Sequence, residues 1–149
     1  MKALYAGSFD PFTIGHFSIA KRALGFFDQL VIGVGFNENK RIETPIEERV
    51  KEISKLFVED KRVIVKQYRG LTAEFARSVG AGVLIRGLRN VSDFEKEKEL
   101  ADINREVLGI DTLFLVSDPS LSFVSSSMVR ELRHNGFNAD AYIASVKEE

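Results

Sequence analysis

The feature that most constrains this chain is the stretch GSFDPFTIGH at residues 7–16, which follows a short apolar run at residues 3–6. A strand that ends in a glycine-bearing loop and enters a helix brings backbone N–H groups and the positive helix end to one point, which suits phosphate oxygens. Thr13 can cap this helix, so that Gly15 and His16 lie in its first turn. An imidazole held there can donate to a phosphoryl group that gains negative charge in a transition state. The stretch therefore predicts a nucleoside triphosphate site.

The spacing of the glycines excludes two familiar phosphate loops. Gly15 lies eight residues after Gly7 and no Lys follows it. The stretch is therefore neither a G-x-G-x-x-G dinucleotide loop nor a G-x-x-x-x-G-K-[ST] P-loop. By itself it could also be a plain turn begun by Asp10 and Pro11, with His16 a half-buried helix residue that has no chemical role.

Length and composition predict one domain over residues 1–149. The chain has 149 residues, of which 44% are hydrophobic, and this is enough to bury one sizeable core. A net charge of −1, from 21 basic and 22 acidic residues, argues against docking on nucleic acid or an anionic membrane. The absence of Cys from the sequence excludes disulfides, a thiolate nucleophile and a zinc–thiolate site. Without a long apolar run, we expect a soluble, cytoplasmic protein.

Along the chain, apolar runs alternate with helical patterns, which predicts an α/β fold. The predicted strands cover residues 3–6, 30–36, 62–66, 82–85 and 112–116. The predicted helices cover residues 15–27, 45–57, 71–79 and 92–108, with two more that begin at 125 or 126 and at 138. We expect Thr44 and Ser92 to cap two of them, and Leu100, Ile103 and Val107 to form the buried stripe of the 92–108 helix. Because each crossover places a helix on one face, the expected architecture is a doubly wound, five-stranded parallel sheet.

Each polar motif follows a predicted strand. These motifs are residues 7–16, 37–40, 70–72, 86–89 and 117–127. Ligands of such sheets lie outside the carboxyl ends of the strands, at the point where the strand order reverses. We therefore expect the five segments to line one cleft.

Two of these motifs carry groups suited to phosphate. Arg86 and Arg89 follow an apolar strand, and a planar guanidinium offers paired donors to phosphate. The alternative is that both form surface ion pairs. Ser125, Ser126 and Ser127 at a helix start supply hydroxyls and free N–H groups for a pyrophosphate. Alternatively, one of them is an N-cap and the others are ordinary loop serines.

The three motifs together resemble a known family. Residues 7–16 resemble the (H/T)-x-G-H signature of the nucleotidyltransferase superfamily, with Thr13 where many members carry a first His. With IRGLR at residues 85–89 and FVSSS at 123–127, the chain resembles the bacterial phosphopantetheine adenylyltransferases from about residue 2 to residue 145. This resemblance implies a Rossmann-like enzyme of coenzyme A biosynthesis that moves AMP from ATP to 4′-phosphopantetheine, giving dephospho-coenzyme A and pyrophosphate.

The resemblance also implies roles for single residues. His16 and Lys40 would contact the reacting phosphates, and Ser8 would bind both ATP and the acceptor. Arg86 and Thr72, with Lys40, would hold phosphopantetheine. The ATP site would further contain Phe9, Gly87, Leu88, Arg89, Glu97, Leu121, Ser122, Phe123, Val124, Ser125, Ser126 and Ser127. By themselves, Lys40 on a polar loop and Glu97 in a charged run would be solvated residues.

Other ligands follow from the same resemblance. Mg²⁺ should arrive with ATP and be held largely by phosphate and water, since the sequence suggests no carboxylate cage. The resemblance further implies a homohexamer, with coenzyme A as a feedback ligand. Two alternatives stay open: transfer to another phosphorylated acceptor, such as nicotinamide mononucleotide or glycerol 3-phosphate, or a nucleotide-binding module without turnover. Thr13 and residues 85–89 favour the pantetheine branch, and a module gives no reason for a second anion site at Lys40 and Arg86.

Overall fold

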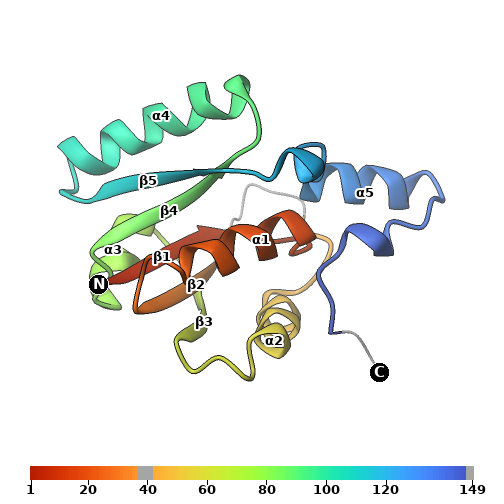
Figure 1. Cartoon of the computed structure of the whole chain (residues 1–149), viewed down its shortest axis with the longest axis horizontal. Helices are drawn as coiled ribbons and strands as arrows, with labels where there is room; N and C mark the ends of the chain where they lie inside the picture. The colour runs from red at the N-terminus through yellow and green to blue at the C-terminus, as the bar shows by residue number, and fades with distance from the viewer. Residues whose placement is uncertain (37–41, 147–149) are drawn as a thin grey trace.

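The computed structural model describes residues 1–36 and 42–146. Within these residues, five parallel strands form one sheet in the order β3-β2-β1-β4-β5 (Figure 1). The strands are β1 (Lys2–Gly7), β2 (Gln29–Gly35), β3 (Val63–Tyr68), β4 (Val83–Leu88) and β5 (Asp111–Val116). The strand order reverses between β1 and β4, so the switch point lies at their carboxyl ends. The predicted fold class is thus confirmed.

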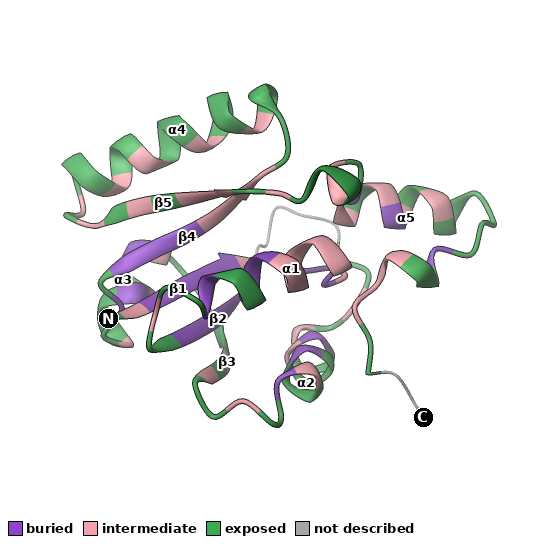
Figure 2. Cartoon of the chain, in the orientation of Figure 1, coloured by how far each residue is buried: buried purple, intermediate pink, exposed green. Residues whose placement is uncertain are grey.

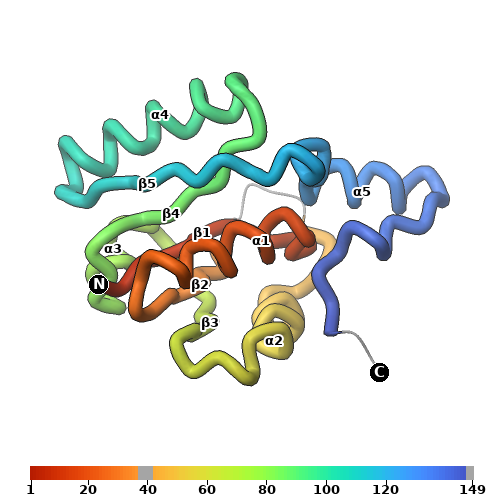
Figure 3. Tube along the Cα trace, in the orientation of Figure 1, coloured from red at the N-terminus to blue at the C-terminus, as the bar shows by residue number. Residues whose placement is uncertain are grey.

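The helices cover both faces of this sheet. They are α1 (Ile14–Ala23), α2 (Ile46–Leu56), α3 (Thr72–Ser78), α4 (Val91–Glu106) and α5 (Ser126–His134), with short 3₁₀ turns at Pro119–Leu121 and Asp140–Tyr142. Residues of α1 and α2 pack on one face, and residues of α3 pack on the other. The trace in Figure 3 shows α5 beyond the carboxyl ends of the strands, next to the loop that precedes α1.

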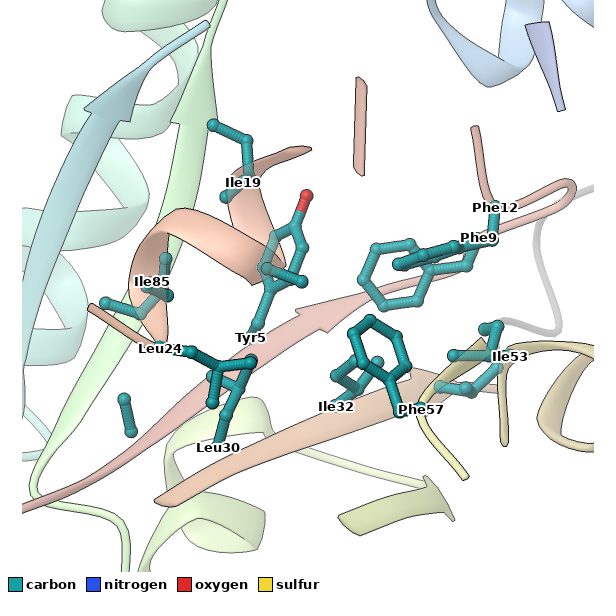
Figure 4. Close-up of a cluster of buried hydrophobic side chains, with 14 of the residues drawn as sticks. Tyr5, Phe9, Phe12, Ile19, Leu24, Leu30, Ile32, Ile53, Phe57 and Ile85 are labelled. Carbon is teal, nitrogen blue, oxygen red and sulfur yellow. The ribbon is translucent and has the colours of Figure 1, made fainter. Parts of the chain in front are cut away.

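The core is centred on β1 and β2, which are buried on both faces (Figure 2). Tyr5, Leu30 and Ile32 point toward α1 and α2, where Ile53 and other side chains pack on them (Figure 4). Leu30 and Ile32 are fully buried, and each such side chain contributes about 1.5–3 kcal/mol to stability. The nearly continuous apolar run at residues 30–36 therefore reflects a central strand, as predicted.

Two predicted helix caps are wrong. Asn90, and not Ser92, caps α4, and its side chain accepts a hydrogen bond from the Asp93 N–H at 2.8 Å. Among the described residues, α2 has no side-chain cap, and Pro45 occupies the N-cap position. The carbonyl of Thr44, the expected cap, accepts a hydrogen bond from Arg49 Nε at 2.9 Å, so this residue serves α2 through its backbone.

The predicted buried stripe of α4 is also wrong. Leu100, Ile103 and Val107 are 55%, 53% and 72% exposed. None of the α4 residues, all of which the structure describes, is buried. The half-buried positions of this helix are Asp93, Glu97, Ala101 and Asn104. The helix therefore turns a polar stripe toward β4 and β5 and leaves its apolar stripe at the surface of the chain.

The C-terminal segment differs from the expected helix as well. In its described part, which ends at residue 146, a 3₁₀ turn covers Asp140–Tyr142, and the chain then runs back to the loop before α1. Ile143 forms an antiparallel bridge with Thr13, and the N–H of Ala144 donates to the Phe12 carbonyl at 3.1 Å. Among the described residues, no helix has the length and apolarity that are needed to span a bilayer.

Candidate active site

A cavity of about 540 Å³ opens at the carboxyl ends of β1 and β4. Its walls are the loop after β1, the first turn of α1, the end of β4, the start of α4 and the start of α5. The predicted site residues that line it are Ser8, Phe9, His16, Arg86, Gly87, Leu88, Arg89, Glu97, Leu121, Val124, Ser125, Ser126 and Ser127. Segments that are remote along the chain therefore share one cavity at the switch point.

Four predicted residues are not among the described lining of this cavity. Thr72 Oγ1 lies 2.9 Å from Tyr68 Oη, and Ser122 Oγ donates to the Pro119 carbonyl at 3.1 Å. Phe123 is 58% exposed and packs edge-on against Tyr142, with 5.6 Å between the ring centroids. Lys40 lies outside the described residues.

The loop after β1 is shaped by the Phe9 ring. Phe9 has a φ of +49°, a left-handed conformation that costs energy in a bulky residue. A Cβ on Gly7 would lie 2.9 Å from this ring, so only glycine lets the loop fold back on itself there. The ring is buried, with its centroid 5.0 Å from that of Phe12 and 5.2 Å from that of Tyr5. Phe9 therefore forms an aromatic floor at one end of the cavity.

The first turn of α1 fixes the tautomer of His16. The backbone N–H of Thr13 donates to His16 Nδ1 at 2.9 Å, and the N–H of His16 donates to Thr13 Oγ1 at 3.2 Å. These two bonds form a capping box at the start of α1. Because Nδ1 accepts a hydrogen bond from the backbone, the neutral ring carries its proton on Nε2. His16 Nε2–H is therefore the group that can donate to a ligand.

The surroundings of His16 keep it uncharged. The centroids of the Phe9 and Phe12 rings lie 5.0 and 5.5 Å from that of the imidazole. Burial, together with the positive charges of Arg86 and Arg89, lowers the pKa of His16 from 6.5 to about 3. At neutral pH this side chain is a neutral donor that faces two cations, which suits a developing negative charge.

The end of β4 brings the two arginines to the cavity. The strand continues to Leu88, so Arg86 and Gly87 belong to it and only Arg89 follows it, whereas the sequence predicted a loop from residue 86. A Cβ on Gly87 would lie 3.1 Å from Ile19 Cγ1, which shows how closely β4 passes α1 at this point. Both guanidinium groups make ion pairs with carboxylates of α4.

The three serines at the start of α5 differ in their contacts. Ser125 is the N-cap, because its Oγ accepts from the Met128 N–H at 3.1 Å. Ser126 Oγ donates to the Pro11 carbonyl at 2.7 Å, and Ser127 Oγ accepts from Arg130 Nη2 at 3.3 Å. The helix N-terminus thus faces the cavity and is fastened to the loop after β1, an arrangement that suits an anionic ligand.

The sequence analysis missed two cations in the cavity wall. Arg49 is buried, and its guanidinium donates to the carbonyls of Ser8 and Thr44. Burial lowers the pKa of Arg49, although Asp10 and Glu47 act in the opposite direction. Arg130 donates to the Asp10 carbonyl at 2.7 Å. These arginines hold the loop after β1 from two sides.

Three acidic or ionisable residues of the wall were also missed. Asp93 binds Arg89, and the four-residue spacing of this pair was a signal in the sequence. His134 Nε2 contacts Glu43 Oε1 at the cavity rim, and the Glu43 N–H donates to Asp10 Oδ2 at 2.9 Å. The described residues, 1–36 and 42–146, contain no group of three or more His, Cys, Asp or Glu side chains that could hold a metal ion.

Comparison with known families agrees with this geometry. The family model described as cytidylyltransferase-like matches residues 4–132, and the chain belongs to this family.

Within that family, the chain belongs with the phosphopantetheine adenylyltransferases. It is 49% identical to the protein of this name from Phocaeicola vulgatus, over 95% of this chain and 94% of that relative. It is 50% identical to the one from Bacteroides fragilis, over 93% of this chain and 91% of that relative.

Solved structures show the same fold at low identity. A bifunctional NMN adenylyltransferase/ADP ribose pyrophosphatase from Francisella tularensis, complexed with AMP and a manganese ion, matches 98% of this chain with a TM-score of 0.66 and 14% identity. A second crystal structure of the Francisella tularensis enzyme matches 95% of this chain with a TM-score of 0.69 and 15% identity. This chain spans 45% and 44% of the two structures, so the likeness concerns the nucleotidyltransferase fold alone.

Proposed function

We propose that this protein transfers AMP from ATP to 4′-phosphopantetheine and releases dephospho-coenzyme A and pyrophosphate. The observation that carries the proposal is the neutral His16 imidazole, which lies in one cavity with two guanidinium groups and a helix N-terminus. The full-length similarity to phosphopantetheine adenylyltransferases supports the choice of acceptor.

The reaction asks the protein for positioning and charge stabilisation. An oxygen of the acceptor phosphate forms a bond to the α-phosphorus of ATP, and the bond from that phosphorus to the pyrophosphate oxygen breaks. The acceptor phosphate is already anionic near neutral pH, so no general base is needed. The barrier lies in bringing two polyanions together and in the charge that develops at the α-phosphorus. Hydrogen-bond donors and fixed cations meet both demands.

Each group then has a role. His16 Nε2–H donates to the α-phosphate oxygen that gains charge, and Lys40 binds the reacting phosphates with it. Ser8 contacts both substrates. Arg86 holds the phosphate of phosphopantetheine, and Arg89 holds ATP together with the start of α5. Thr72, which lies beside Tyr68 and outside the described lining, would contact the pantetheine arm.

Mg²⁺ enters this proposal as part of the substrate complex. The described wall carries four arginines, and its four carboxylates are engaged by arginines, a histidine or backbone N–H groups. Such a wall does not fit a protein cage for the ion. Phosphate oxygens of ATP and water are therefore its ligands, and Mg²⁺ neutralises phosphate charge when it is bound.

A single assay tests the proposal. Purified protein is mixed with ATP, Mg²⁺ and 4′-phosphopantetheine, and pyrophosphate release is followed, with nicotinamide mononucleotide and glycerol 3-phosphate as separate acceptors. We expect release that depends on 4′-phosphopantetheine. Release with only one of the other acceptors would assign a different transferase, and no release with any acceptor would leave a nucleotide-binding module.

The exposed side of α4 supports an oligomer, for which the family resemblance implies six copies. Leu100, Ile103 and Val107 of α4 lie at the surface, and Leu113 and Val116 of β5 are 47% and 66% exposed. An apolar surface of this kind is usual at an interface between subunits. Sedimentation equilibrium of the wild type should give a hexamer, and Ile103→Glu should give smaller species. A wild type that sediments as a monomer would end this part of the proposal.

A further inference from the structure

Two carboxylates of α4, those of Glu97 and Asp93, bind the two arginines of the cavity. Arg86 donates from Nε to Glu97 Oε2 at 2.8 Å and from Nη2 to Glu97 Oε1 at 2.7 Å. Arg89 donates from Nε to Asp93 Oδ2 at 2.9 Å and from Nη2 to Asp93 Oδ1 at 3.1 Å. In both pairs, the carboxylate takes the same edge of the guanidinium in a bidentate contact, which is the most directional form of this interaction.

The backbone sets the geometry of these pairs. Asp93 and Glu97 are one helical turn apart on the inward stripe of α4, so they share a face. The Asn90 cap fixes the helix start through the Asp93 N–H, and Asp93 Oδ2 also accepts from the Arg89 N–H at 3.0 Å. On the other side, Arg86 Nη1 donates to the Ala6 carbonyl of β1. Arg86 is thus positioned by β4 and both carboxylates by α4, while the backbone N–H of Arg89 is bound to Asp93.

Burial separates these pairs from an ordinary surface ion pair on the same helix. The side chains of Glu97 and Asp93 are 15% and 22% exposed. Lys98 and Asp102 are also four residues apart and 2.7 Å from one another, but their side chains are 57% and 62% exposed. A solvated pair of this kind contributes little, whereas a half-buried bidentate pair restricts both side chains.

We propose that Glu97 and Asp93 are positioning residues, which act on the substrates through Arg86 and Arg89 respectively. This inference rests on the proposed function. A guanidinium has five N–H groups, and Arg86 spends three of them on Glu97 and Ala6, so its other two are left for a phosphate. Fixing the occupied edge in advance removes rotamer freedom that a substrate would otherwise have to restrict on binding. Both Glu97 oxygens accept from Arg86, so Glu97 acts on the acceptor through this guanidinium.

The test compares Glu97→Gln and Asp93→Asn with Asp102→Asn, a matched control that removes the carboxylate of the exposed pair on the same helix. The measured quantities are kcat and the KM values for ATP and for 4′-phosphopantetheine. Glu97→Gln should raise the KM for 4′-phosphopantetheine by about 10-fold and change the KM for ATP by less than about twofold. Asp93→Asn should do the reverse, and Asp102→Asn should change neither.

A double-mutant cycle shows whether Glu97 acts through Arg86. In an Arg86→Ala background, Glu97→Gln should raise the KM for 4′-phosphopantetheine by less than about twofold, because the group that it orients is gone. A full additional increase, or a KM change confined to ATP in Glu97→Gln, would overturn the inference. Thermal unfolding of each variant separates these outcomes from loss of structure, since a misfolded variant would lose both substrates together.

The failure of the inference differs from the failure of the proposed function. An active wild type with unchanged KM values in both variants would overturn the inference alone. A wild type that does not use 4′-phosphopantetheine would overturn the proposed function. In that case, calorimetric titration with ATP still tests whether Asp93 acts on ATP through Arg89. Asp93→Asn must weaken ATP binding, and Asp102→Asn must not.

Discussion

The helices α1 and α4 both begin at the cavity, but they meet the sheet in opposite ways. On α1, Ile19, Ala20 and Ala23 are buried against the core. On α4 no residue is buried, its polar stripe faces the sheet, and its apolar stripe faces outward (Figure 2). The difference shows that amphipathic spacing predicts a helix with a polar and an apolar face. It does not predict whether the apolar face packs on the sheet of the same chain. On α4, the inward Asp93 and Glu97 hold the two arginines of the cavity.

The largest expected effect comes from comparing a buried apolar side chain of the core with an exposed one on α4. Ile53 of α2, which packs in the core, is 1% exposed, whereas Ile103 of α4 is 53% exposed. Ile53→Ala should lower the free energy of unfolding by about 2–5 kcal/mol at every protein concentration, because it leaves a cavity. Ile103→Ala should cost less and chiefly reduce the rise of Tm with protein concentration, because the proposed interface is coupled to stability. Denaturant and thermal unfolding at two protein concentrations measure both, and equal losses would erase the distinction between the two side chains.

The next prediction concerns the cavity end of α1. His16→Ala should lower kcat by roughly 10²- to 10³-fold with little change in Tm, because it removes a donor to the transition state and leaves the core intact. His16→Gln, which keeps a donor of different reach, is the matched variant and should retain more activity. An unchanged kcat in His16→Ala would remove this side chain from catalysis.

The pH dependence of stability gives a smaller effect. The pKa of His16 is lowered from 6.5 to about 3 by burial and by the two arginines, so the unfolded chain binds a proton between these pH values that the folded chain does not. The contribution of neutral His16 is therefore complete above pH 6.5 and is lost as the pH falls toward 3. Its slope is at most about 1.4 kcal/mol per pH unit. Urea titrations from pH 7 to pH 4 should show a steeper loss for the wild type than for His16→Gln, and parallel curves would contradict the assignment.

The smallest effect tests the cap that joins α1 to the site. Thr13→Ala should lower the free energy of unfolding by about 1 kcal/mol, because the His16 N–H loses its acceptor, while the Thr13 backbone bond to Nδ1 remains. Thr13→Ser keeps the hydroxyl and should behave nearly as the wild type. If the two variants were equally destabilised, the hydroxyl would not be the relevant group.

The sequence predicted the sheet well, because β-branched apolar runs and crossover helices leave few topologies. It placed two caps wrongly for a local reason: Asn90 and Ser92 are both good cap residues, and only the position of the Asp93 N–H decides between them. The sequence predicted a buried apolar stripe on α4 because hydrophobic periodicity identifies an apolar helix face but does not show whether that face packs on the sheet.

In the site, the sequence predicted residues that sit in recognisable motifs and missed those that bind backbone. Arg49 and Arg130 both donate to main-chain carbonyls of the loop after β1, those of Ser8 and Asp10. Every residue has such a carbonyl, so no side-chain pattern marks the acceptor. Asp93 is the exception, since its spacing from Arg89 is readable in the sequence.

The fastening of the first loop by the last segments has a consequence during synthesis on the ribosome. The Pro11 and Phe12 carbonyls are bound by Ser126 and Ala144, more than a hundred residues downstream. A nascent chain that has emerged as far as β5 already holds all five strands of the sheet, but the bonds from Ser126 and Ala144 to the Pro11 and Phe12 carbonyls cannot yet form. Catalytic competence should therefore appear only at the very end of translation, well after the hydrophobic interior has had the chance to assemble.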